Sequence, residues 1–293
     1  MRQVRLGAMR VDRVWEMDGS MPMPMALPGV TAADLARMKP WHWSEELSDD
    51  PAQCHMKLSV QSYVLRLDGL NILVDACNGN HKTRGMPFAN NLETPWLEHL
   101  AALGLQPGDI HMVMCTHLHA DHVGWNTRLE NGRWVPTFPN ARYVFSRKEY
   151  EHWSQDDAEE MHRGAFEDSV LPVVSAGLAD LVETDHVAHR EIGDGIWLED
   201  ISGHSPGLVA IHAQRGGGHA VFPGDCFHHP IQLVRPDLVF FADEDGAEAS
   251  HQRRRLLSAC ADTGTVVFPA HFRDPCAGHV RGDGEVFRFE FLE

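Results

Sequence analysis

Runs of apolar residues along the chain predict short strands that are separated by turns, with a few helices between them. Residues 63–75 hold two strand-like runs on either side of Asp68-Gly69, a dipeptide typical of tight hairpins. Residues 4–16 alternate loosely and predict a first strand. Residues 93–103 and 247–261 instead place apolar side chains at helical spacing. The pattern therefore mixes hairpins with strands that are followed by helices.

Three later apolar runs end at turns that are flanked by Gly or Pro and carry a polar side chain. These side chains are His204, Asp225 and His271. A turn at a strand end can aim such a side chain at a common point. A single loop histidine is more often polar surface than a ligand, so no one of the three indicates a site alone.

The most informative stretch is Thr-His-Leu-His-Ala-Asp-His at residues 116–122, directly after an apolar run. It holds three imidazoles and a carboxylate: His117, His119, Asp121 and His122. These positions do not share one face of a helix, so we expect a loop that turns all four side chains to one point. Neutral imidazole with carboxylate suits zinc or a similar first-row ion. A merely histidine-rich polar loop is the alternative, since the chain has 20 His, but the spacing favours a metal site.

Composition and charge narrow the class of protein. The chain has 293 residues, of which 43% are hydrophobic and 23% charged, as in globular proteins. It shows no linker and no repeat, so we expect a single domain over residues 1–293. The net charge of −17 makes a nucleic acid an improbable partner.

Localisation is inferred from what the sequence lacks. No apolar run approaches the ~18 residues of a membrane span, and the start of the chain does not resemble a signal peptide. The six cysteines are scattered without a C-x-x-C pair, which predicts reduced thiols. We therefore expect a cytoplasmic protein that contacts no membrane.

Residues 18–55 predict an irregular N-terminal arm. Residues 21–29 contain three prolines, which disfavour a helix interior or a central strand. Two compatible interpretations remain: a packed arm or homodimer contact, or an apolar lip over a pocket. On the second interpretation Met23, Trp41 and Trp43 are candidate substrate contacts.

With these motifs in this order, residues 55–275 resemble the metallo-β-lactamase-fold hydrolases. The resemblance implies an α+β protein, a four-layer αββα sandwich with two mixed sheets between helices. It also implies two divalent metal ions, with Zn²⁺ favoured and Fe, Mn or Co as alternatives. In the implied arrangement one ion is held by His117, His119 and His204 and the other by Asp121, His122 and His271, with Asp225 bridging.

Within this family the chain looks closest to the N-acyl-homoserine lactonases and the methyl-parathion-hydrolase-like enzymes. Residues 226–232 and 253–257 carry this similarity. Asp225 stands where some β-lactamases place a cysteine, which disfavours β-lactam cleavage. The lactonases carry a tyrosine three residues after the bridging aspartate, and His228 occupies that place here.

The resulting hypothesis is a dinuclear hydrolase that opens a lactone or another carboxylic ester. Two cations that share Asp225 would also share a water, whose pKa falls from about 15.7 towards about 7 to give a hydroxide nucleophile. Asp121 would take up the proton that passes to the leaving group. His228 and His229 are candidate donors to the substrate, or alternatively residues that orient the loop backbone. Phosphotriester hydrolysis and a mononuclear iron persulfide dioxygenase are the alternative functions.

Overall fold

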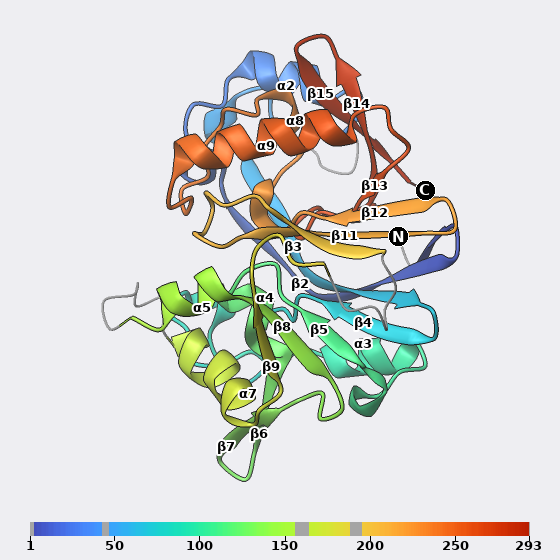
Figure 1. Ribbon diagram of the computed structural model, residues 1–293. Coiled ribbons are helices and arrows are strands. Elements are labelled where there is room, and N and C mark those ends of the chain that lie inside the picture. Colours follow the sequence, from blue (N-terminus) through green and yellow to red (C-terminus); the bar gives the residue numbers. More distant parts are fainter. Residues whose placement is uncertain (1–2, 43–46, 156–163, 188–194, 293) are drawn as a thin grey trace.

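Two β-sheets pack face to face, and helices cover the outer face of each (Figure 1). The computed structural model describes residues 3–42, 47–155, 164–187 and 195–292. Both sheets are mixed, so the predicted α+β sandwich of four αββα layers is confirmed. No helix within the described ranges is both long and apolar enough to cross a bilayer.

The first sheet begins with hairpins and continues with parallel strands. Strands β1 to β4 run antiparallel, whereas β4, β5, β8 and β9 are parallel neighbours. The predicted hairpin about Asp68-Gly69 is confirmed, and both turn residues have the positive φ that such a turn needs. In sheet order the strands are β1 (Gln3–Leu6), β2 (Met9–Pro22), β3 (His55–Leu67), β4 (Leu70–Val74), β5 (Met112–Met114), β8 (Arg142–Ser146) and β9 (Ala179–Val182).

The second sheet is antiparallel except for the pair β12 and β13, which is parallel. Its last hairpin, β14 and β15, has no counterpart among the predicted elements, and neither has a small separate hairpin of β6 (Thr127–Glu130) and β7 (Arg133–Pro136). In order the strands are β10 (Ile196–Asp200), β11 (Val209–Arg215), β12 (Gly218–Phe222), β13 (Val266–Val267), β14 (Gly278–Asp283) and β15 (Val286–Phe291).

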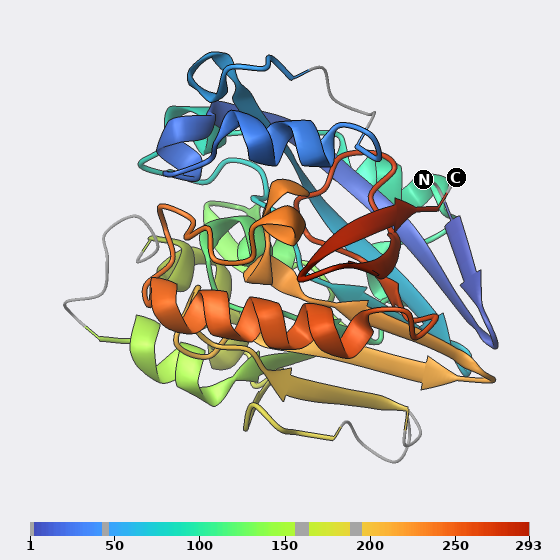
Figure 2. The ribbon, with the colours of Figure 1, turned by 90° about the horizontal axis from the view of Figure 1, so that it is seen from above.

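Helices form the outer layers. The helices predicted over 93–103 and 247–261 are present as α3 (Trp96–Ala102) and α9 (Gly246–Cys260), and α9 lies over the second sheet (Figures 1 and 2). The remaining α-helices are α1 (Met23–Ala26), α2 (Ala32–Met38), α4 (Ala120–Val123), α5 (Arg147–Trp153), α7 (Leu171–Ser175) and α8 (Ile231–Val234). The short 3₁₀ turns are η1 (Pro51–Gln53), η2 (Pro87–Ala89), η3 (Pro107–Asp109), η4 (Gly124–Asn126) and η6 (Gly224–Cys226), and η5 (Phe166–Val170) is a π-helical turn.

Strand β3 shows how the sequence divides the core. Side chains alternate between the two faces of a strand, so neighbouring residues enter different layers. Tyr63 and Leu65 pack in the cluster between the two sheets, together with Phe222 of β12. Val64 packs in the other cluster, beneath the helices of the first sheet. An almost continuous apolar run is therefore required, because both faces of β3 are covered.

The predicted irregular arm is only partly irregular. Strand β2 continues to Pro22, which pairs with His55, and a capping box of Thr31 and Asp34 starts helix α2. Proline is tolerated at Pro22 because β1 pairs only with the first part of β2, so this part of β2 is a sheet edge. Trp43 lies outside the described residues.

Candidate metal centre

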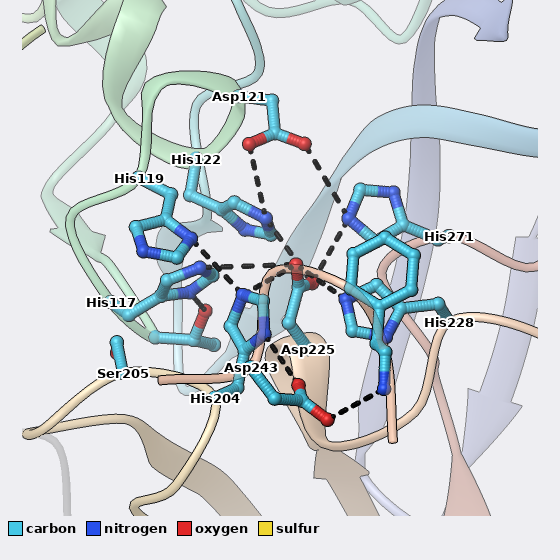
Figure 3. Close-up of polar contacts among 12 residues, drawn as sticks. His117, His119, Asp121, His122, His204, Ser205, Asp225, His228, Asp243 and His271 are labelled. Atoms are coloured by element: carbon cyan, nitrogen blue, oxygen red, sulfur yellow. Dashed lines mark hydrogen bonds and ion pairs between the residues drawn. The ribbon is translucent and has the colours of Figure 1, made fainter. Parts of the chain in front are cut away.

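Segments that follow strands of both sheets bring the seven predicted ligands together, and their side chains point toward one another (Figure 3). The predicted loop at 116–122 is a loop only in its first half, because α4 begins at Ala120. Asp121 and His122 are neighbours on this short helix, so their side chains point in directions about 100° apart and can contact different parts of the site. His117 and His119 follow β5, Asp121 and His122 lie on α4, and His204, Asp225 and His271 follow β10, β12 and β13.

The ligand atoms fall into two neighbouring groups. The nitrogens of His117, His119 and His204 lie within 4.8 Å of one another. One ligand atom each from Asp121, His122 and His271 forms a second group under the same limit. The first group is fully buried, whereas Asp121 in the second has a side chain that is 30% exposed.

Asp225 lies between the two groups, and each of its oxygens faces one of them. Oδ1 is 3.2 Å from His122 Nε2 and 3.0 Å from His271 Nε2. Oδ2 is 3.3 Å from His204 Nε2 and 3.9 Å from His117 Nε2. This is the position that a carboxylate bridging two ions would occupy.

Hydrogen bonds at the far side of the imidazole rings orient the ligands. His122 Nδ1 is 2.9 Å from Asp75 Oδ2, and His204 Nδ1 is 2.9 Å from Asp243 Oδ1. His271 Nδ1 lies 2.9 Å from the carbonyl oxygen of Ser59. Each contact lets Nδ1 donate a hydrogen bond and leaves Nε2 directed at the site, as is usual for metal-binding histidines.

The ligand motif is held close to the loop that follows β4. Asp75 accepts hydrogen bonds from the backbone N–H of Thr116 at 2.8 Å and also from its hydroxyl. At Gly124 an added Cβ would lie 1.8 Å from the carbonyl oxygen of Asn78, so only glycine allows this approach.

The electrostatics of the group favour positive charge at its centre. Burial raises the pKa of the Asp225 carboxyl, but the charges of His271, His122 and His228 outweigh it and hold the pKa well below its usual range. For His204 burial lowers the pKa, but the carboxylates of Asp225 and Asp243 raise it to about 9. The carboxylates therefore attract protons to the imidazoles when no other cation is bound.

Two buried atoms test whether a metal ion suits this site. His122 Nε2 and Asp225 Oδ1 are 3.2 Å apart, yet neither has a hydrogen-bond partner within the described ranges. A buried polar atom without a partner costs about 1–3 kcal/mol. A divalent cation between them would satisfy both atoms, and oxygen and imidazole nitrogen are the donors that zinc accepts. The residues fit the implied ions.

An apolar pocket opens over the ligands. It encloses about 650 Å³ of empty space, including its open mouth. Its floor is formed by Asn78 and by residues of the metal centre, namely His119, Ala120, Asp121, His204, Asp225, His228 and His271. Its walls are Met21, Leu58, Val60, Met86, Phe88, Phe240, Phe241 and Ala242.

The predicted substrate residues differ in whether they line the pocket. His228 lines the pocket, with Nε2 3.2 Å from Asp225 Oδ2 and its ring stacked on Phe240 at 3.7 Å. Burial lowers the pKa of His228 to about 4. Met23, Trp41 and His229 are not among the lining residues.

Each of these three residues packs elsewhere. Met23 is the first residue of α1 and is fully buried in the core, and Met21, two residues earlier, reaches the pocket instead. Trp41 is partly buried against both apolar clusters. His229 Nδ1 accepts a hydrogen bond from the backbone N–H of Ile231 at 3.2 Å, so this histidine orients loop backbone.

Two kinds of residue were missed by the sequence analysis. Asp243 supports His204 from a loop 39 residues away, and no motif marks it. Phe88 and Phe241 form the pocket mouth, with exposures of 46% and 44%. The adjacent aromatic residues of 240–241 were the available signal, since exposed aromatic side chains often mark a binding surface.

The fold and the ligand arrangement define a metal-binding αββα protein, and sequence comparison gives its family. The profile of the metallo-beta-lactamase superfamily matches residues 56–271. The chain belongs to this superfamily.

Curated relatives match over a short stretch only. The chain is 41% identical over 51 residues to the N-acyl homoserine lactonase AttM of Azorhizobium caulinodans, which is 17% of this chain and 16% of the relative. It is 38% identical over 56 residues to AttM of Agrobacterium fabrum, or 19% of this chain and 18% of the relative. The chain therefore matches less than a fifth of the length of these relatives.

Solved structures match over nearly the whole chain. The hydrolase AbOPH of the beta lactamase superfamily gives a TM-score of 0.82 at 19% identity, covering 100% of this chain and 97% of that one. AidC, a dizinc quorum-quenching lactonase, gives 0.78 at 19% identity over the same shares of the two chains. A probable metal-dependent hydrolase from Staphylococcus aureus gives 0.78 at 19% identity, covering 99% of each chain. At sequence identities this low, the structural similarity shows a shared fold and nothing more specific.

Proposed function

We propose that the protein is a dinuclear metal-dependent hydrolase that opens a lactone or another carboxylic ester. The observation that carries the proposal is the position of Asp225, which lies between two groups of ligands at the floor of an apolar pocket. A structural metal site would be closed on all sides, whereas this one is open to a space that a small molecule can enter.

The residues that would hold the ions are those of the two groups. His117, His119 and His204 would hold one ion, and Asp121, His122 and His271 the other, with Asp225 shared. When bound, such ions lower the pKa of a coordinated water and polarise the carbonyl oxygen of an ester. Zn²⁺ is the proposed metal, because imidazole nitrogen and carboxylate oxygen make up the whole ligand set.

Two side chains are proposed to act beside the metal ligation. Asp121 is the more exposed carboxylate at the pocket floor, and its oxygens lie 3.5 Å or more from the imidazole nitrogens of His271 and His122. It can therefore take up a proton and pass it to the leaving group. His228 lines the pocket three residues after Asp225, and we propose that it contacts the polar end of the substrate.

The walls of the pocket indicate the rest of the substrate. They are formed by methionine, aliphatic and phenylalanine side chains, with Asn78 as a polar residue near the floor. A substrate with an apolar chain and an ester group would place the chain against these walls and the ester over Asp225. The AttM relatives and the AidC structure, both lactonases by name, support a lactone as the ester.

A substrate panel tests the proposal. The purified protein, loaded with Zn²⁺, is assayed against N-acyl lactones, aryl esters, thioesters, a phosphotriester and glutathione persulfide. We expect the highest kcat/KM for a lactone or ester, and we expect Asp225→Ala to lose it. Preferential cleavage of the phosphotriester would show that the substrate is a phosphotriester and not a carboxylic ester or lactone. Oxygen consumption with the persulfide, in protein that holds one iron, would contradict the proposal altogether.

A further inference from the structure

Glu149 is a fully buried carboxylate that belongs to neither group of ligands. It lies near the start of α5, just after β8, and its side chain reaches both ligand loops of the first metal group. It has no salt bridge to a lysine or arginine among the described residues. Within the described residues, hydrogen bonds take the place of an ion pair with lysine or arginine, which is unusual for a buried acid.

Each oxygen of Glu149 accepts hydrogen bonds from a different loop. Oε2 accepts from the backbone N–H of Leu118 at 3.0 Å and from Trp153 Nε1 at 2.9 Å. Oε1 accepts from the hydroxyl of Ser205 and the backbone N–H of Gly207, both at 2.7 Å. Four donors converge on two oxygens, so only a carboxylate can satisfy all of them.

The two loops are the ones that carry the three-histidine group. Leu118 lies between His117 and His119, and Ser205 directly follows His204. Gly207 is packed so tightly that an added Cβ would lie 2.8 Å from the backbone nitrogen of Glu149. The carboxylate thus sets the distance between two chain segments that are 87 residues apart, from 118 to 205.

The second ligand group is supported by other residues. Asp75 holds His122, and the carbonyl oxygen of Ser59 holds His271. Neither contact involves Glu149 or its helix. Asp75 also accepts hydrogen bonds from Thr116, the neighbour of His117, so Asp75 and Asp225 link the two groups, whereas the contacts of Glu149 are with the loops of the first group.

We propose that Glu149 is a positioning residue for one ion of the pair, the ion of His117, His119 and His204. The inference rests on the proposed two-ion site and adds to it that one ion of the pair depends on Glu149 more than the other does. Loss of the carboxylate should let the loops of residues 117–119 and 204–207 move apart, while the group of Asp121, His122 and His271 keeps its geometry.

Glu149→Gln tests this with little change in side-chain volume. The amide replaces one oxygen by an NH₂ group that faces two donors, so one of the loops loses its contacts. We expect the affinity for one of the two Zn²⁺ ions to fall by about 10–100-fold, the range for residues that support metal ligands, while the other changes less than about twofold. Competition with a chromophoric chelator measures both affinities, and anomalous diffraction shows which position has lost its ion.

Glu151→Gln is the matched control. It removes the same charge from the same helix at an exposed position, and it should leave both affinities unchanged. If Glu149→Gln does not fold, Ser205→Ala removes only the 2.7 Å contact with Oε1 and should weaken the same ion by a smaller factor. Thermal unfolding of the metal-free proteins shows whether the fold is intact.

The outcomes separate this inference from the proposed function. Equal weakening of both ions, or of neither, overturns the role of Glu149 while the two-ion proposal stands. If the unaltered protein binds one ion within the three-histidine group, the two-ion proposal fails, and Glu149→Gln must still weaken that ion at least about tenfold. An ion held only by Asp121, His122 and His271 overturns both.

Discussion

Lys82 offers a prediction whose size follows directly from its surroundings. Its side chain is 1% exposed and lies on the loop that leads to the pocket residues Met86 and Phe88. The ammonium group donates to Thr127 Oγ1 at 2.8 Å, is 3.4 Å from Asp168, and lies 3.6 Å from the centre of the Trp134 ring.

These contacts do not fully offset the free-energy cost of removing the Lys82 ammonium group from water. Burial lowers the pKa of Lys82 from 10.5 to about 8; the Asp168 carboxylate opposes this change, and the charge of Arg84 adds to it. The folded protein therefore holds this proton less tightly than the unfolded chain does. Below about pH 8 both states are protonated and the full penalty, about 3 kcal/mol, acts against folding. The penalty is relieved as the pH rises from about 8 to 10.5.

The variant Lys82→Met removes the charge and keeps most of the side-chain volume. From the two pKa values, the unaltered protein should gain about 2.5 kcal/mol in free energy of unfolding, relative to the variant, between about pH 7 and about pH 10. Urea unfolding of both proteins at both pH values measures this difference, and the contributions of all other groups cancel.

A difference between the two proteins that stays constant across this pH range would refute the reasoning. It would mean that Asp168 and Thr127 compensate the buried charge completely. A change of opposite sign would mean that the folded state holds the proton more tightly, as in a strong ion pair.

Substitutions at four further positions test the site. Asp225→Ala should abolish hydrolysis while circular dichroism stays unchanged; a loss of only a few-fold in kcat at full metal content would contradict the bridging role. Asp243→Ala should lower the affinity for one ion by about 10–100-fold in chelator competition, since His204 Nδ1 loses its acceptor, and parental affinity would refute this. His228→Phe should cost about tenfold in kcat/KM, or about 1.4 kcal/mol, whereas His228→Tyr should keep lactone hydrolysis; if both variants match the parent, His228 does not contact substrate. Phe88→Ala should raise KM several-fold for long-chain esters and little for short ones, and equal effects on both would argue against a substrate contact.

The hairpin and the grouping of the candidate ligands could be predicted because their signals are local, whereas the αββα sandwich was implied by the resemblance of residues 55–275 to a known family. The spacing of His117, His119, Asp121 and His122 is visible within one short stretch, and the same holds for the Asp68-Gly69 hairpin. A strand end flanked by glycine or proline limits where the next side chain can point.

The lining of the pocket depends on packing between distant segments, which local patterns do not record. Met21 and Met23 are two residues apart in a similar context, yet one ends a strand and faces the pocket while the other starts a helix and enters the core. The composition of this segment indicates apolar, adaptable side chains but gives no direction for them.

The supporting carboxylates escaped prediction for a related reason. Asp243 contacts His204, and Glu149 contacts sequence neighbours of the ligand histidines; these partners are far away in the sequence, and each carboxylate lies in a stretch without a motif. A buried acid in an amphipathic helix looks the same in sequence as an exposed one. Only the hydrogen bonds that converge on it reveal its role.

The most direct test of the central claim is a zinc titration of the metal-free protein with lactone hydrolysis as the readout. The protein is stripped with a chelator, Zn²⁺ is added in steps, and the rate is measured at each ratio of metal to chain. We predict negligible activity without metal and a rate that reaches its maximum only at two ions per chain. Full activity in the stripped protein, or a maximum at one ion per chain, would contradict a dinuclear hydrolase.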